Sequence, residues 1–130
     1  MDGQIDILSP PIENNHPKIL TLRCPIRSFS IEEVVLAEVD EVSTFVVQKR
    51  RDEHLSGRWL LAQALSHWGI SPNELQVRRN EFRAPSLAFI HGVWKNIDLP
   101  SISIGHSEGW AYVALIESGW TIGIDGEKSD

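Results

Sequence analysis

Two carboxylates near the end of the sequence have a spacing that suits a divalent metal ion. Asp125 and Glu127 follow the apolar run Ile122-Gly123-Ile124. Because residues i and i+2 of a strand point to the same side, both carboxylates could face one hard cation such as Mg²⁺. Water and substrate phosphate would then complete the coordination. The alternative interpretation is that the two acids begin a solvated turn after a strand.

A histidine lies among small residues in the stretch Ser103-Ile104-Gly105-His106-Ser107. The alternation of apolar residues predicts a strand that ends just before His106. A histidine at a strand end can donate a hydrogen bond to a phosphate, and a serine hydroxyl and nearby backbone N–H groups can join it. The alternative is a surface turn histidine. Ser107 does not indicate a hydrolase, because the chain has no G-x-S-x-G elbow and adjacent residues of an extended segment point apart.

The middle of the sequence could present cations to a phosphate. Residues 49–83 hold 7 bases and 4 acids, whereas the whole chain has a net charge of -6. Arg51, His54 and Arg58 have the spacing of one helix face. An acidic protein with a basic centre is poorly suited to duplex DNA, which rewards many phosphate contacts, and better suited to a small phosphorylated ligand. The alternative is a solvated basic helix face whose arginines pair with neighbouring acids.

Composition limits the class of protein. The chain has 130 residues, of which 42% are hydrophobic, and this is enough for one folded domain with a core. Its single cysteine, Cys24, excludes an internal disulfide. The first residues contain acids and no secretory signal pattern, and no stretch approaches the roughly 20 apolar residues that span a bilayer. We therefore expect a cytoplasmic protein with no membrane or nucleic-acid partner.

One long helix must position these side chains. Gly57, Leu61, Ala64, Leu65 and Trp68 form an apolar stripe of helical period, which predicts a helix over 43–68 that ends at a glycine cap at position 69. A glycine inside a helix is unfavourable, so a close neighbour is expected at position 57.

Shorter elements surround this helix. A capping box predicts a helix from 31 to about 40, and Ser71-Pro72-Asn73-Glu74 predicts a single turn. Strands are expected at 18–25, 75–78, 101–104, 110–116 and 120–124, with 87–94 ambiguous. The residues at 117–119 are spaced to join the last two strands as a hairpin. We predict an α+β fold in which the long helix packs on a mainly antiparallel sheet. The whole chain, 1–130, would be one lobe with an irregular segment at 1–17.

The order of these features resembles the 4'-phosphopantetheinyl transferase superfamily, specifically the N-terminal half of its two-lobed, carrier-protein-activating type. The resemblance covers about residues 43–128. The matching residues are 51–65 (RDEHLSGRWLLAQAL), Pro85, 101–107 (SISIGHS) and 122–128 (IGIDGEK). The chain departs from the family at Gly105, where a serine is usual, and at Gly126, where an apolar residue is usual.

The resemblance implies a definite reaction. These enzymes transfer the phosphopantetheine arm of coenzyme A to a serine of an acyl- or peptidyl-carrier protein and release adenosine 3',5'-bisphosphate. By position, Asp125 and Glu127 would bind Mg²⁺ and His106 would contact a coenzyme A phosphate. Arg51 or Arg58 would assist from the helix, and Arg83 would replace a lysine that the family places before Pro85.

The family's second lobe carries a W-x-x-K-E-A-x-x-K motif that is absent here. The resemblance implies that this motif would supply another acidic ligand or the general base, and a lysine that binds phosphate. We therefore expect a missing C-terminal lobe or a second chain to complete the enzyme. The alternative is a non-catalytic domain that binds coenzyme A or a carrier protein.

Overall fold

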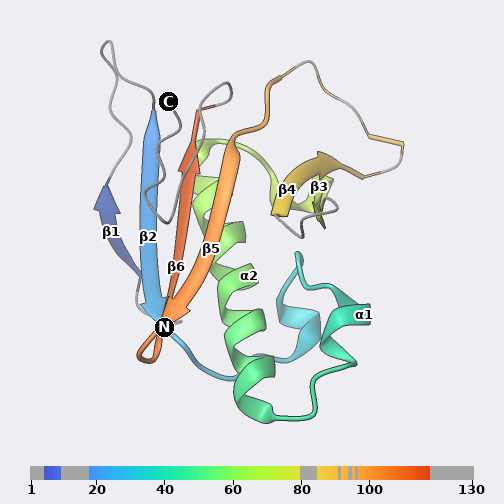
Figure 1. Ribbon diagram of the computed structural model, residues 1–130. Helices are drawn as coiled ribbons and strands as arrows, with labels where there is room; N and C mark the ends of the chain where they lie inside the picture. Colours follow the sequence, from blue (N-terminus) through green and yellow to red (C-terminus); the bar gives the residue numbers. More distant parts are fainter. Residues whose placement is uncertain are drawn as a thin grey trace.

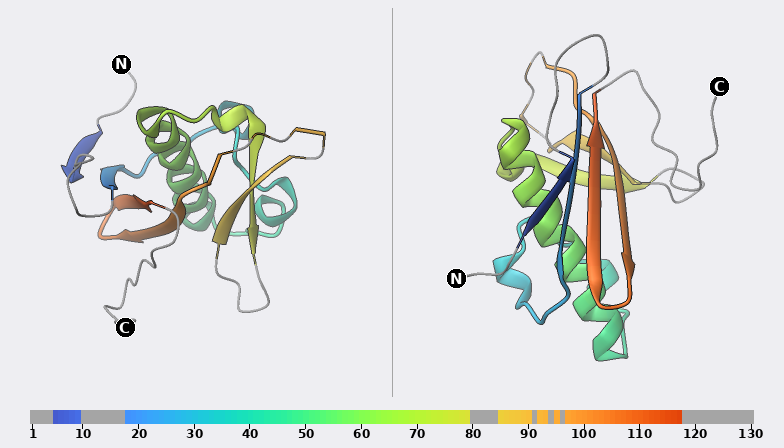
Figure 2. Two further views of the ribbon diagram at one scale, coloured as in Figure 1. Left: turned by 90° about the horizontal axis from the view of Figure 1, so that it is seen from above. Right: turned by 90° about the vertical axis from the view of Figure 1, so that its left-hand side faces the viewer.

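The fold is built on one long helix and a four-stranded antiparallel sheet. The computed structural model describes residues 5–9, 18–79, 85–90, 92–93, 95 and 97–117. Helix α2 (Gln48–Trp68) lies against one face of the sheet, whose strand order is β1-β2-β6-β5 (Figures 1 and 2). The strands of this sheet are β1 (Asp6–Ser9), β2 (Ile19–Pro25), β5 (Ser101–Ser107) and β6 (Trp110–Ile116). The predicted α+β class and its helix-on-sheet arrangement are confirmed.

A second, two-stranded antiparallel sheet lies beside this unit. It consists of β3 (Leu75–Arg79) and β4 (Pro85–Phe89), near the short helix α1 (Val39–Val42) and the upper part of α2 (Figure 1). The turn that precedes β3 is a 3₁₀ turn over Pro72–Glu74, with proline at its start as predicted. None of the described helices is long and apolar enough to cross a membrane.

The core lies between α2 and the sheet because both surfaces are apolar on one side only. Strand β2 alternates buried and half-buried residues along its length. Its buried residues lie opposite the buried residues of β6 in the order Leu20–Leu115, Leu22–Val113 and Cys24–Ala111. Leu60, Leu61, Ala64 and Leu65 of α2 belong to the same cluster. Alternation on the strands and helical spacing on α2 therefore bury one continuous core.

Helix α2 is shorter than predicted at its start. It begins at Gln48 rather than at residue 43, because Ser43 ends the separate helix α1 and residues 44–47 form the connection. Its end agrees with the prediction: Gly69 has φ +103°, and its N–H donates to the Leu65 carbonyl. A left-handed residue at this position favours glycine, which explains the cap.

The predicted helix from 31 to about 40 is wrong. The capping box at Ser30 and Glu33 is present, but it begins only a 3₁₀ turn over Ile31–Glu33. Val34 is extended (φ −118°, ψ 97°), and it is buried in a small cluster with Phe29, Val42 and Leu55. A β-branched side chain that packs in this way favours extended backbone over helix.

Two strand predictions also change. Within the segment expected to be irregular, Asp6–Ser9 form β1, which pairs with β2. Strand β5 continues to Ser107 and pairs with β6 through the two-residue turn Glu108-Gly109, whose φ values are +47° and +85°. Positive φ at both positions matches the right-handed twist of a hairpin. The strand predicted at 120–124 and its hairpin with 110–116 lie outside the described residues.

Candidate functional site

His106 lies inside β5, on the side of the sheet that faces α2. It was expected just beyond the strand, but it is paired with Ala111 of β6, one residue before the strand ends. Its Nε2 atom is 3.5 Å from Oε1 of Glu53 in the second turn of α2. The His106 side chain is 51% exposed and that of Glu53 is 13% exposed. The imidazole of His106 therefore contacts Glu53 and remains accessible to solvent.

A glycine of α2 allows β5 to lie close to the helix near His106. A Cβ atom added to Gly57 would lie 3.0 Å from Cγ2 of Ile104, the residue of β5 that precedes His106 on the same face. This is the close neighbour expected at position 57, and it is a side chain rather than another backbone. The small residue lets Glu53, one turn earlier on α2, reach the histidine.

Arg58 does not lie with His106. Its side chain is 2% exposed, and its two terminal nitrogens contact the Leu36 carbonyl at 3.2 Å and Glu38 Oε1 at 3.3 Å. The side chain therefore binds protein oxygens in the interior and is not exposed to solvent. Arg51, one of the three residues expected on this helix face, is half-buried.

His54 lies on the same flank of the helix as Arg58. Its Nε2 atom accepts a long hydrogen bond (3.5 Å) from the Glu38 N–H, and its ring contacts that of Phe45. Burial, followed by repulsion from Arg58, lowers the pKa of His54 to about 4. Burial also lowers the pKa of the Arg58 guanidinium, although nearby Glu38 opposes that shift. His54 is therefore neutral near pH 7 and does not add a cation.

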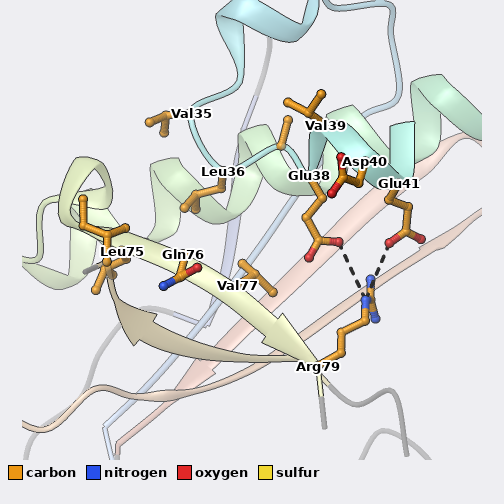
Figure 3. Close-up of a pocket in the computed structure, with 12 residues that line it drawn as sticks. Val35, Leu36, Glu38, Val39, Asp40, Glu41, Leu75, Gln76, Val77 and Arg79 are labelled. Atoms are coloured by element: carbon orange, nitrogen blue, oxygen red, sulfur yellow. Dashed lines mark ion pairs between the residues drawn. The ribbon is translucent and has the colours of Figure 1, made fainter. Parts of the chain in front are cut away.

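Glu38 is the centre of an ion-pair network. Besides Arg58, its carboxylate lies 3.8 Å from Nε of Arg79, and the same nitrogen lies 3.8 Å from Glu41 Oε1. These groups border a cavity of about 610 Å³ between β3 and residues 35–41, with the carboxylates directed toward Arg79 (Figure 3). The network joins α2, the α1 region and β3.

The remaining predicted site residues do not meet at His106 within the described structure. Pro85 begins β4, opposite Arg79 of β3. Arg83, Asp125 and Glu127 lie outside the described residues. Among the residues that the structure does describe, no group of three or more His, Cys, Asp or Glu side chains could hold a metal ion.

Sequence reasoning missed the two carboxylates that organise the described groups, Glu53 and Glu38. Glu53 is one of the acids next to the helix arginines, with which it could have paired, and it instead contacts a strand 53 residues later in the chain. Glu38 belongs to the acidic stretch Glu38-Val39-Asp40-Glu41. The signal that could have found it is the contrast between this stretch and the basic residues 49–83 that follow.

Comparison with known proteins adds no assignment to these observations. No protein-family model matches the chain, and no curated protein matches it.

Proposed function

We propose that this chain is a lobe of a 4'-phosphopantetheinyl transferase that acts on an acyl- or peptidyl-carrier protein with coenzyme A as co-substrate. The proposal rests on the order of the motifs in the sequence. One structural observation supports it most directly: the histidine of the SISIGHS motif lies near the end of β5, half exposed and braced by Glu53. A braced and accessible imidazole suits the binding of a phosphate group.

In this proposal His106 donates a hydrogen bond to a phosphate of coenzyme A. Glu53 is a positioning residue, since it touches the imidazole and not the substrate. Arg51 and Arg83 would add positive charge near the nucleotide, and Pro85 would fix the start of β4. Arg58 is assigned a role in stabilising the fold around the site, because its guanidinium already binds the Leu36 carbonyl and Glu38.

The carboxylates of Asp125 and Glu127 are hard oxygen donors of the kind that Mg²⁺ prefers, so the donor set fits that ion. When bound, Mg²⁺ would stabilise negative charge on the pyrophosphate of coenzyme A. In the transfer, the carrier serine oxygen bonds to phosphorus as the bond to adenosine 3',5'-bisphosphate breaks, and the serine proton passes to a base. We place that base in a second lobe or a second chain.

Equilibrium dialysis with labelled coenzyme A in the presence of Mg²⁺ tests the role of His106. The substitution His106→Ala is expected to weaken binding about tenfold, since it removes a hydrogen bond to a charged group. The matched control is His67→Ala, an exposed histidine in the last turn of α2, which should bind like the wild type. Equal affinities for all three proteins would contradict the assigned role.

A second assay tests whether the chain transfers the phosphopantetheine arm without a second lobe. The chain, coenzyme A, Mg²⁺ and an apo carrier protein are incubated together, and the mass of the carrier protein is measured. A mass increase by one phosphopantetheine group supports transfer, with a second copy of the chain supplying the base. Binding of coenzyme A without such an increase fits a lobe whose base lies in a second lobe, and it also fits the alternative, a non-catalytic domain that binds coenzyme A or a carrier protein.

A further inference from the structure

One edge of strand β3 faces the 610 Å³ cavity. Across the described part of the chain, β3 pairs with β4 alone. Residues 75–77 and Arg79 of β3 line one wall of the cavity, and residues 35–41 line the other (Figure 3). The cavity therefore lies between this edge of β3 and residues 35–41. An uncovered edge offers backbone donors and acceptors to another chain.

The phase of the β3–β4 ladder shows which backbone groups face this edge. The Ile90 N–H donates to the Glu74 carbonyl at 3.1 Å, so these two residues form a hydrogen-bonded pair. Such pairs alternate along an antiparallel ladder, so the backbone groups of Leu75 and then of Val77 are directed away from β4. The Leu75 N–H already donates to the Pro72 carbonyl, so the groups that face this edge for a partner are the Leu75 carbonyl and the N–H and carbonyl of Val77. The position of Pro85 agrees with this phase, because the missing N–H of proline would also lie on the side away from the partner strand.

The charge on the cavity wall favours a basic ligand. Glu38, Asp40 and Glu41 line it together with one cation among the described residues, Arg79, which lies 3.8 Å from two of the three carboxylates. Asp40 is exposed and has no ion pair with any described residue. Together with Arg58, which pairs with Glu38 from inside the protein, these five groups have a net charge of −1, which a lysine or arginine side chain would balance.

The same cavity has an apolar part. Leu36, Leu75 and Val77 line it from both walls and are buried in the core. Val35 and Val39, at 49% and 62% exposure, are large apolar side chains on the wall opposite β3. A bound segment could therefore bury apolar side chains beside a charged one, which is the pattern of an extended strand with alternating residues.

We propose that an extended basic peptide segment of a partner protein binds in this cavity by pairing with the edge of β3 that no described strand covers, with a lysine or arginine directed to Asp40 and Glu41. Main-chain hydrogen bonds would supply affinity, and the acidic wall would supply specificity, as in other cases of strand addition. This inference is independent of the proposed transferase activity.

Fluorescence anisotropy with a labelled pentapeptide, Val-Lys-Val-Arg-Val, tests the proposal. We expect saturable binding that weakens as salt is raised, and none by the acidic analogue Val-Glu-Val-Glu-Val. The double variant D40N/E41Q should weaken binding roughly fivefold. The control E32Q/D98N removes the same charge from exposed acids outside the cavity and should bind like the wild type.

Backbone methylation tests the strand pairing itself. Methylation of the peptide amides in one alternating register should abolish binding, while methylation in the other register should leave it unchanged. Equal effects of the two registers, or equal binding of the two double variants, would overturn the proposal. Concentration-dependent dimerisation that D40N/E41Q abolishes would assign the edge to a second copy of the chain and would overturn it as well.

Discussion

The Nη2 atom of Arg58 lies 3.3 Å from Oε1 of Glu38, and this contact joins the long helix to the segment that leads into α1. Arg58 is 2% exposed, so its charge is compensated by the protein. Glu38 also meets Arg79 of β3. One carboxylate therefore connects three parts of the fold, including the hairpin strand that borders the cavity.

Removal of the buried guanidinium should destabilise the fold. Arg58→Ala leaves the Leu36 carbonyl and part of the Glu38 carboxylate without a partner, and we expect the free energy of unfolding to fall by about 2–3 kcal/mol. The fall is smaller than for an isolated buried pair because Arg79 remains near Glu38. Urea denaturation measures it. Arg50→Ala, on an exposed position of the same helix, should change stability by less than about 0.5 kcal/mol, and equal losses in the two variants would contradict this account.

The contact between Gly57 and Ile104 predicts a substitution whose sign depends on its neighbour. In the wild-type background Gly57→Ala should cost about 1 kcal/mol, since its Cβ would lie 3.0 Å from Cγ2 of Ile104. In the Ile104→Ala background the same change should be stabilising, because the clash is gone and alanine favours helix over glycine. Thermal or urea unfolding of all four proteins gives the coupling. Additive effects would show that the two residues do not meet.

The neutral state of His54 predicts a loss of stability on acidification. Burial lowers the pKa of its imidazole to about 4 in the folded protein, whereas the ordinary value is 6.5. Between these values the unfolded chain binds a proton that the folded chain does not. The free energy of unfolding should therefore fall as the pH drops from about 6.5 to about 4, and this contribution should level off at lower pH.

The variant His54→Asn isolates this effect from the titration of carboxylates. Its unfolding free energy, compared with the wild type at each pH, should fall less steeply over the same range. His67→Asn, at an exposed position, serves as the control and should follow the wild type. Parallel curves for the wild type and His54→Asn would contradict the assignment.

The single thiol should be inert in the folded protein. Cys24 is 1% exposed in the core, and burial raises the pKa of its thiol to about 11. Since the thiolate is the reactive form, a thiol reagent at pH 8 should modify the native protein far more slowly than the urea-unfolded protein. Fast labelling of the native protein would mean that β2 opens readily.

Local signals predicted the elements that depend on local chemistry. The apolar stripe and the glycine cap at position 69 defined the body and end of α2, and the proline turn before β3 was found from four residues. The helix predicted from 31 to about 40 failed because the burial of Val34 outweighs a capping box. The hairpin turn at Glu108-Gly109 was missed because Glu-Gly is a weaker turn signal than Asn-Gly or Asp-Gly.

The candidate site could be predicted only in part. His106 was selected from its neighbours in the sequence, but its contact with Glu53 depends on the packing of β5 against α2, which no local pattern specifies. The helix-face pattern suggested a phosphate contact for Arg58. Such a pattern does not show that residues 36–38 cover the Arg58 side chain. Sequence patterns therefore could not predict contacts between residues that are distant in the sequence.

Calorimetric titration with coenzyme A, with and without Mg²⁺, tests the central claim most directly. The proposed function predicts that the wild-type chain binds coenzyme A in a Mg²⁺-dependent manner and that Asp125→Ala loses this dependence, while Asp98→Ala retains it. Binding that is identical with and without Mg²⁺, or that Asp125→Ala leaves unchanged, would contradict the assignment of this chain to phosphopantetheine transfer.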